Sequence, residues 1–293
     1  MLDPLGGNKT LGALPDQERQ EYYRSLTGLS GLESREIKGI FQGDPNRRLY
    51  EARETILGYI QDEHIVPASS IVPQKPLKNR TLDVTLDRFH VQRYPGSSKH
   101  TIQINFSVEH LVNLTEKTSS DVLIKQDVLY GYIIEAVDGQ AAPLVGAAIF
   151  RGLRIQNELQ MKIATIHLVD RVEQRILEVL QSDVMKKGLT LISTVNPVFS
   201  MISELIIGTT QMFLSREKNR AIHEVPIGLL INAADADPKL REGSYLLVQA
   251  DADWFELNDY YWNRARGRVE HNELHEELAF NYMVFSLKKS LTQ

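Results

Sequence analysis

The chain has 293 residues, 42% of them hydrophobic and 24% charged, which is typical of a folded globular protein and excludes a disordered chain or a fibre. It has no cysteine, so disulfides, thiolate metal sites and a cysteine nucleophile are excluded. The formal net charge of −5 disfavours a nucleic-acid-binding protein, and we expect no nucleic-acid partner. Residues 1–12 carry no basic cluster followed by an apolar run, so we expect a cytoplasmic location.

Residues 1–64 are expected to form a helical N-terminal arm. The strongest helix candidate runs from Pro45 to Glu63, because proline is tolerated in a first helical turn. Its apolar residues recur at three- and four-residue spacing, as one face of a helix requires: Leu49, Ala52, Ile56, Leu57 and Ile60. Three prolines then predict an extended connector over residues 65–80.

Residues 81–293 are expected to form the main domain, because the apolar period changes to two at residue 81. Two alternating segments, 82–91 and 102–108, flank a turn at 94–98 and predict an antiparallel hairpin or meander. The last strand candidate, 279–287, is apolar on both faces, which predicts a central position in its sheet. The other strand candidates are residues 129–137, 147–155, 159–168, 222–231 and 244–250.

A helical pair is expected to interrupt these strands at residues 170–216. Asp170 and Glu173 have the spacing of a capping box, and a second helix is expected to start near Asn196. Within the pair, residues 188–215 contain a single charged residue, Glu204, over a length that could span a membrane. Nine polar or proline residues favour a buried helix instead. The alternative is a membrane-active, pore-forming-like protein that releases this segment.

About eight strands with turns between them, and no regular alternation of strands with helices, favour a mainly β fold. We therefore expect an antiparallel β-sandwich with an inserted helical pair and a helical N-terminal arm.

An acidic loop follows the strand candidate at 244–250 and contains Asp251, Asp253 and Asp259. Clustered carboxylates at a loop tip supply oxygen ligands of the kind calcium prefers. This D-x-D-x5-D spacing after a strand resembles the third calcium-binding loop of C2 domains, which are calcium- and phospholipid-binding β-sandwiches. The resemblance covers about fifteen residues and implies that these three aspartates bind Ca²⁺. Asp235 and Asp237 could approach the same end of the domain.

The resemblance to C2 domains is incomplete at the first calcium-binding loop. The corresponding connection here, residues 92–100, contains no acidic residue. A C2-like sandwich with only a weak Ca²⁺ site is the form of the hypothesis that fits best. The alternative is that the aspartates keep a turn soluble.

An aromatic and basic cluster lies beside the acidic loop. Aromatic rings and arginines at a loop tip can bind a protein partner or anchor at a membrane surface. The alternative is that the rings pack under the loop as a small secondary core. The candidate binding residues are Trp254, Phe255, Tyr260, Tyr261, Trp262, Arg264 and Arg266.

Evidence for catalysis is sparse, because no nucleophile elbow, phosphate-binding loop or dinucleotide motif occurs. His271 and His275 have a spacing that suits zinc on a helix, although a polar turn explains them as well. Together with the aspartates, they define an alternative function as a metal-dependent hydrolase. The leading hypothesis is a non-enzymatic binding or assembly protein that uses the loop end of the sandwich. Its arm is expected to dock on a partner subunit and form a homo-oligomer.

Overall fold

The computed structural model describes residues 11, 17–18, 21–22, 54–96, 98–113, 123–143, 146–168, 189–190, 220–250 and 255–291. The expected helical pair at 170–216 lies outside these residues, except for Leu189 and Thr190. The described part is mainly β and its sheets are antiparallel, as the sequence predicted. In the described part, parallel pairing occurs between β7 and β9 over two residue pairs, and as an isolated bridge between Leu230 and Lys239. Within the described part, no helix has the length and apolarity needed to cross a bilayer.

The larger sheet has ten strands, in the order β13-β12-β2-β1-β11-β14-β3-β7-β9, with β6 paired to β3. Their bounds are β1 Glu54–Gln61, β2 His64–Pro67, β3 Arg80–Val91, β6 Gln140–Ala141, β7 Ala147–Ile155, β9 Leu189–Thr190, β11 Gly243–Ala250, β12 Tyr260–Asn263, β13 Arg268–His271 and β14 Tyr282–Lys289. Two short 3₁₀ helices, η3 Lys75–Leu77 and η4 Leu257–Asp259, lie in the connections.

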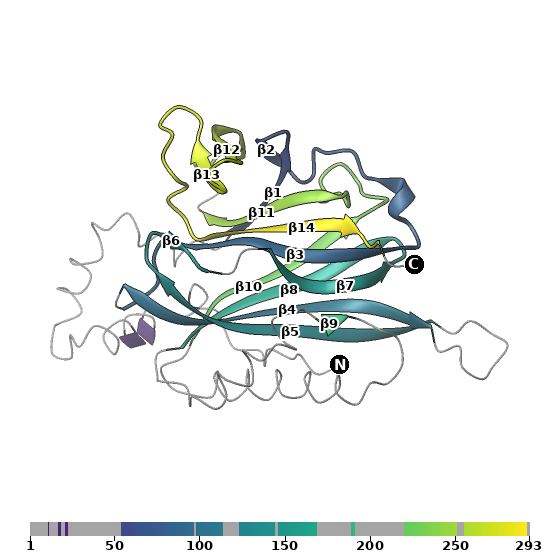
Figure 1. Cartoon of the computed structure of the whole chain (residues 1–293), viewed down its shortest axis with the longest axis horizontal. Coiled ribbons are helices and arrows are strands. Elements are labelled where there is room, and N and C mark those ends of the chain that lie inside the picture. The colour runs from purple at the N-terminus through teal and green to yellow at the C-terminus, as the bar shows by residue number, and fades with distance from the viewer. Residues whose placement is uncertain are drawn as a thin grey trace.

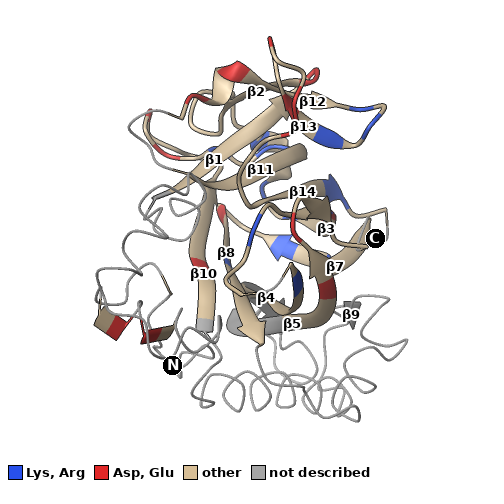
Figure 2. Cartoon of the chain, turned by 90° about the vertical axis from the view of Figure 1, so that its left-hand side faces the viewer, with Lys and Arg blue, Asp and Glu red and all other residues tan. Residues whose placement is uncertain are grey.

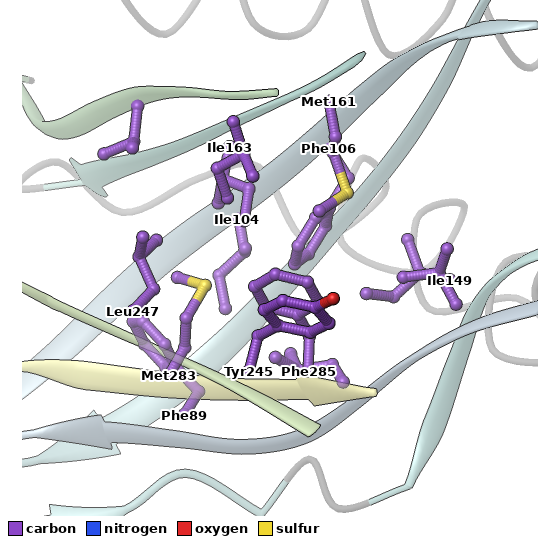
Figure 3. Close-up of a cluster of buried hydrophobic side chains, with 14 of the residues drawn as sticks. Phe89, Ile104, Phe106, Ile149, Met161, Ile163, Tyr245, Leu247, Met283 and Phe285 are labelled. Carbon is purple, nitrogen blue, oxygen red and sulfur yellow. The ribbon is translucent and has the colours of Figure 1, made fainter. Parts of the chain in front are cut away.

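The smaller sheet has four strands in the order β10-β8-β4-β5. Their bounds are β4 Lys99–Asn113, β5 Leu123–Val137, β8 Glu158–Leu168 and β10 Arg220–Leu230. The two sheets form two layers (Figure 1). Between them lies one hydrophobic core, whose side chains come from alternate positions of strands in both layers. Figure 3 shows this core, in which the ring of Tyr245 stacks on that of Phe285 with centroids 5.4 Å apart.

A second hydrophobic cluster covers the other face of the larger sheet. It contains Leu246 and Val248 from β11, Tyr282 and Val284 from β14, and side chains from the segment 255–280. Strand β14 is therefore buried on both faces and lies between β11 and β3. The central position predicted for the last strand is confirmed.

The helix expected from Pro45 to Glu63 is wrong over residues 54–61, which form β1. Leu57 and Tyr59 pack toward the first cluster, whereas Ile56 and Ile60 pack against the second. Residues four apart share one face in a helix and also in a strand, because four is a multiple of the strand period. A strand that is buried on both faces therefore imitates a helical pattern.

The hairpin expected across the turn at 94–98 is also wrong, because β3 and β4 lie in different sheets. Strand β3 pairs with β14 and β7, and β4 pairs with β5 and β8. Alternation correctly predicted that each strand has a buried face. Alternation does not show which neighbouring strand each of them pairs with.

Residues 65–80, expected as an extended connector, contain all but the first residue of β2 and the whole of η3, and contribute to the main core. Ala68, Ile71 and Leu77 are buried in the first cluster. The buried ammonium of Lys239 also holds this segment in place. It donates to the backbone oxygens of Ser69, Ala234 and Asp235 at 2.5, 2.9 and 2.8 Å.

Candidate functional site

An open pocket lies where the β1–β2 turn meets the β12–β13 hairpin, and we call it the hairpin pocket. Its volume is about 390 Å³. Figure 2 shows acidic and basic segments of the ribbon around this end of the larger sheet. The lining residues that carry charged or aromatic side chains are Tyr59, Asp62, Glu63, Arg241, Trp262 and Arg264.

The β1–β2 turn places two carboxylates at the rim of the pocket. Asp62 and Glu63 form this two-residue turn with positive φ values of 49° and 77°. Such values suit the right-handed twist of a hairpin, although glycine or asparagine usually occupies them. The amide of Trp262 donates to the carbonyl of Glu63 at 2.7 Å. This bond fixes β12, and with it the Trp262 ring, against the turn.

Tyr59 forms one wall of the pocket. Its hydroxyl donates to the backbone oxygen of Glu242 at 2.7 Å. Its ring meets the ring of Tyr245 edge-on, with centroids 5.2 Å apart. Burial raises the pKa of Tyr59, and the nearby Arg241 guanidinium partly opposes that effect. The phenol is therefore neutral near pH 7 and acts as a fixed donor.

The charges of the pocket are balanced and accessible to solvent. The Nε atom of Arg264 lies 3.8 Å from a carboxylate oxygen of Glu63, and the two side chains are 78% and 49% exposed. An ion pair this exposed contributes little to stability, because water screens it. Arg241 donates to the carbonyl of Val72 at 3.3 Å. Val72 is itself 70% exposed, which adds an apolar group close to the rim.

The hairpin that carries Trp262 and Arg264 is held from behind by Glu270, whose side chain is 1% exposed. Burial alone would raise the pKa of Glu270, but hydrogen bonds to its carboxylate outweigh this effect and lower the pKa to about 2. The donors are Asn263 at 2.8 Å, Tyr261 at 2.7 Å, Arg268 at 2.5 Å and Arg266 at 3.0 Å.

Arg268 links the hairpin to the larger sheet through a second carboxylate, Glu277. Its Nη1 atom lies 3.6 Å from Oε2 of Glu277. The other oxygen of Glu277 accepts hydrogen bonds from Arg88 at 2.5 Å and Tyr282 at 2.8 Å. Burial opposes ionisation of Glu277, but His90, Tyr282 and Arg88 lower its pKa to about 2. Both carboxylates are therefore ionised at neutral pH, and the hairpin is rigidly attached.

The aromatic residues predicted as a binding surface divide between the core and the pocket. Phe255 is buried in the second cluster, where Tyr260 stacks on it with centroids 5.1 Å apart. Trp262 packs partly against that cluster and partly lines the pocket. Tyr261 is half-buried and serves as a donor to Glu270. Trp254 lies outside the described residues.

The predicted basic residues have distinct positions. Arg264 lines the hairpin pocket and is largely exposed. Arg266 is 59% exposed and forms an ion pair with Glu270 at 3.0 Å. Arg268, the next arginine of this alternating series, forms ion pairs with Glu270 and Glu277. A series of arginines that balances the following glutamates is one of the two interpretations that the sequence allows.

The predicted acidic ligands lie on either side of β11 in the sequence. Asp235 and Asp237 precede the first residue of β11, whereas the loop that contains Asp259 follows its last residue. The pairing of Tyr261 with His64 brings the chain after Asp259 back beside the β1–β2 turn, next to the start of β11. The approach of Asp235 and Asp237 to the acidic loop stays a prediction. Asp237 caps its own turn by accepting the amide of Ala234 at 3.1 Å. Asp251 and Asp253 lie outside the described residues, and in the described part no three metal-binding side chains cluster.

The His271 and His275 pair lies at the end of β13 and in the following turn rather than on a helix. The Nδ1 atom of His271 accepts the amides of Glu273 and Leu274 at 3.2 and 3.3 Å. His275 has a positive φ of 54°. The alternative of a polar turn describes the arrangement correctly.

A buried polar cluster between the sheets was not predicted as a unit. The ring of Tyr94 lies beside those of His100, His167 and His223, with centroids 5.7, 5.9 and 6.1 Å away. His100 is bonded to Asp138 at 2.7 Å, and its second ring nitrogen lies 3.4 Å from His167. All three histidines are buried strand residues, which sequence alternation alone could not bring together.

The surroundings of these histidines keep two of them neutral. Burial, assisted by the nearby His100, lowers the pKa of His167 to about 3. Burial also lowers the pKa of His223 to about 4. The Nδ1 atom of His223 shares a hydrogen bond of 2.7 Å with Thr165. His223 lines a small cavity of about 20 Å³ between the two sheets, together with Phe89 and Met283.

The comparisons with known proteins give no relative. The chain matches no protein-family model, no curated protein and no solved structure.

Proposed function

We propose that the chain is a non-enzymatic binding and assembly module, in which a C2-like antiparallel sandwich presents the hairpin pocket to a protein partner. The observation that carries this proposal is a pocket of about 390 Å³ that combines Trp262 with charges of both signs. Tryptophan, tyrosine and arginine contribute most of the energy at protein interfaces. Glu270 holds the hairpin rigidly, so little conformational entropy is lost when a partner binds.

The charge balance of the pocket favours a second copy of this chain as the partner. Two acidic residues, Asp62 and Glu63, face two basic ones, Arg241 and Arg264. A two-fold interface brings the same patch of both copies together, so each patch must complement itself. Arg264, which is 78% exposed, can extend from one hairpin toward the acidic turn of the other copy.

Light scattering on the full chain over a range of concentrations tests this proposal. We expect a dimer that Arg264→Glu weakens at least about tenfold, because a like charge then faces the acidic turn of the partner. Arg151→Glu is the matched control, since Arg151 is an exposed arginine on β7 that does not line the pocket. A chain that stays monomeric, or equal losses for both variants, would contradict pairing through the hairpin pocket.

A further inference from the structure

A second open pocket lies at the ends of three neighbouring strands of the larger sheet, and we call it the basic pocket. Its volume is about 450 Å³. Figure 2 shows basic ribbon at the end of β14, close to the C-terminus. The pocket is lined by three cationic side chains and by polar ones, namely Arg80, Arg154, Lys289, Asn79, Thr81 and Ser290.

The strand register places the three cations at the same end of the larger sheet. Arg80 is the first residue of β3, and Lys289 is the last residue of β14, opposite Leu82. Arg154 lies near the end of β7, opposite Thr81. The backbone of the pocket is also fixed, because the amide of Ser290 donates to the carbonyl of Thr81 at 2.9 Å. Side chains alternate between the faces of a sheet, so Arg80 and Lys289 share one face at this end and Arg154 lies on the opposite face.

The positive charge of this pocket is not neutralised by its own lining. No carboxylate lines the pocket within the described residues. The side chains of Arg80 and Lys289 form no ion pair with any other described residue. This concentration of positive charge contrasts with the net charge of −5 for the whole chain.

Two carboxylates that contact the backbone or side chains of the pocket lining accept hydrogen bonds from other donors. Oδ1 of Asp83 accepts the hydroxyl of Ser290 at 2.5 Å and the amide of Gly152 at 2.8 Å. Oε1 of Glu242 accepts the amide of Lys289 at 2.7 Å. Both acids therefore stabilise the backbone around the pocket, while the charged heads of Arg80 and Lys289 are exposed to solvent.

We propose that the basic pocket binds a diphosphate group. Arginine and lysine are the side chains that bind phosphate oxygens best, through charge-assisted hydrogen bonds. A diphosphate carries several negative charges close together, which matches Arg80 and Lys289 on one face of adjoining strand ends. Thr81 and Asn79 also line the pocket, and their side-chain hydroxyl and carboxamide can supply further polar contacts. This inference does not depend on pairing through the hairpin pocket.

Calorimetric titration of the full chain with inorganic pyrophosphate at low salt tests the proposal. We expect binding that weakens as salt is added, because screening reduces exposed charge interactions. Arg80→Gln combined with Lys289→Gln is expected to weaken binding at least about tenfold, since two charge-assisted contacts are lost. Lys288→Gln is the matched control, because it removes an adjacent exposed charge that does not line the pocket.

The outcomes distinguish pyrophosphate binding at the basic pocket from nonspecific attraction to surface charge. An affinity that falls for the double variant and stays within about twofold for Lys288→Gln, with unchanged unfolding temperatures, supports the site. Equal losses for both proteins, or unchanged affinity of the double variant, would overturn it.

The source of the phosphate is resolved by a second arm of the experiment. Co-sedimentation with phosphatidic acid vesicles, with neutral phosphatidylcholine vesicles as the control, measures binding to a lipid phosphate. The unmodified chain could bind these vesicles but not pyrophosphate, and the double variant could lose vesicle binding. That result would assign the phosphate site to a lipid headgroup. Binding to neither pyrophosphate nor these vesicles overturns the proposal.

Discussion

The hydroxyl of Tyr59 occupies the space that a side chain at Gly243 would need. A Cβ atom at position 243 would lie 2.3 Å from this oxygen and 2.8 Å from the ring carbon that carries it. Gly243 also has a φ of +136°, a conformation that only glycine adopts readily. Because Tyr59 lines the hairpin pocket, the shape of this wall depends on the glycine.

Gly243→Ala is expected to lower the free energy of unfolding by about 3 kcal/mol, through backbone strain and the clash with Tyr59. Urea denaturation measures the change. Gly267→Ala is the matched control, since Gly267 has a positive φ of 59° with no atom near its missing Cβ. Its expected cost is about 1 kcal/mol, from the left-handed backbone alone. Equal costs for the two variants would show that the clash is unimportant.

Glu270→Gln is expected to destabilise the protein by about 2–3 kcal/mol, because the buried hairpin donors lose an ionised acceptor. Arg268 is bonded to this carboxylate at 2.5 Å and would keep only its weaker contact with Glu277. Thermal unfolding measures the loss. The exposed Glu273→Gln provides the control and is expected to change stability by less than about 0.5 kcal/mol. A loss no larger than that of the control would contradict the role of Glu270.

Stability is expected to fall as the pH drops from about 6.5 toward 4, through the buried histidines. The pKa of His167 is lowered to about 3 and that of His223 to about 4, so the unfolded chain binds more protons than the folded one in this range. Unfolding temperatures at a series of pH values measure the effect. Glu270 and Glu277, with pKa values lowered to about 2, add a further loss only below about pH 4.5.

The histidine contribution can be separated by substitution. His223→Gln is expected to flatten the dependence of unfolding temperature on pH between 6.5 and 4, even if it lowers the temperature overall. His64→Gln removes an exposed histidine and is expected to keep the slope of the unmodified chain. An unchanged slope for His223→Gln would show that this residue does not titrate with unfolding.

Lys239→Met is expected to cost about 2–3 kcal/mol, because three buried backbone oxygens lose their donor. The loss should also loosen the contact between residues 68–71 and the turn at 234–239. Hydrogen exchange at the amide of Lys239, which donates to Ala68 at 2.9 Å, reports that opening. Lys78→Met, at an exposed lysine, is the control and should leave both stability and exchange unchanged. Protection that survives Lys239→Met would contradict this role.

Most strands could be predicted from the sequence, because a half-buried strand leaves a pattern of period two. Val84 and Leu86 in β3, and Ile102 and Ile104 in β4, show that pattern and are buried. The pairing of these strands could not be predicted, since alternation specifies a buried face but no neighbour. The helix predicted over residues 54–61 is a strand for a related reason. Burial on both faces removes the polar positions that distinguish a strand from a helix.

The candidate site was only partly accessible from the sequence. Trp262 and Arg264 were identified from their clustering, and both line the hairpin pocket. Asp62 and Glu63 could not be found, because they lie about 200 positions earlier in the chain and reach the hairpin only through the pairing of β2 with β12. The basic pocket was missed for the same reason, since its cations come from three separate strands.

The most direct test of pairing through the hairpin pocket mixes two charge-reversed chains. Asp62→Lys and Arg264→Glu each place like charges across a two-fold interface, so light scattering should find each variant monomeric. In an equimolar mixture the reversed charges complement one another, and a heterodimer is expected to form. A mixture that stays monomeric, or an Arg264→Glu chain that dimerises as well as the unmodified protein, would contradict the account.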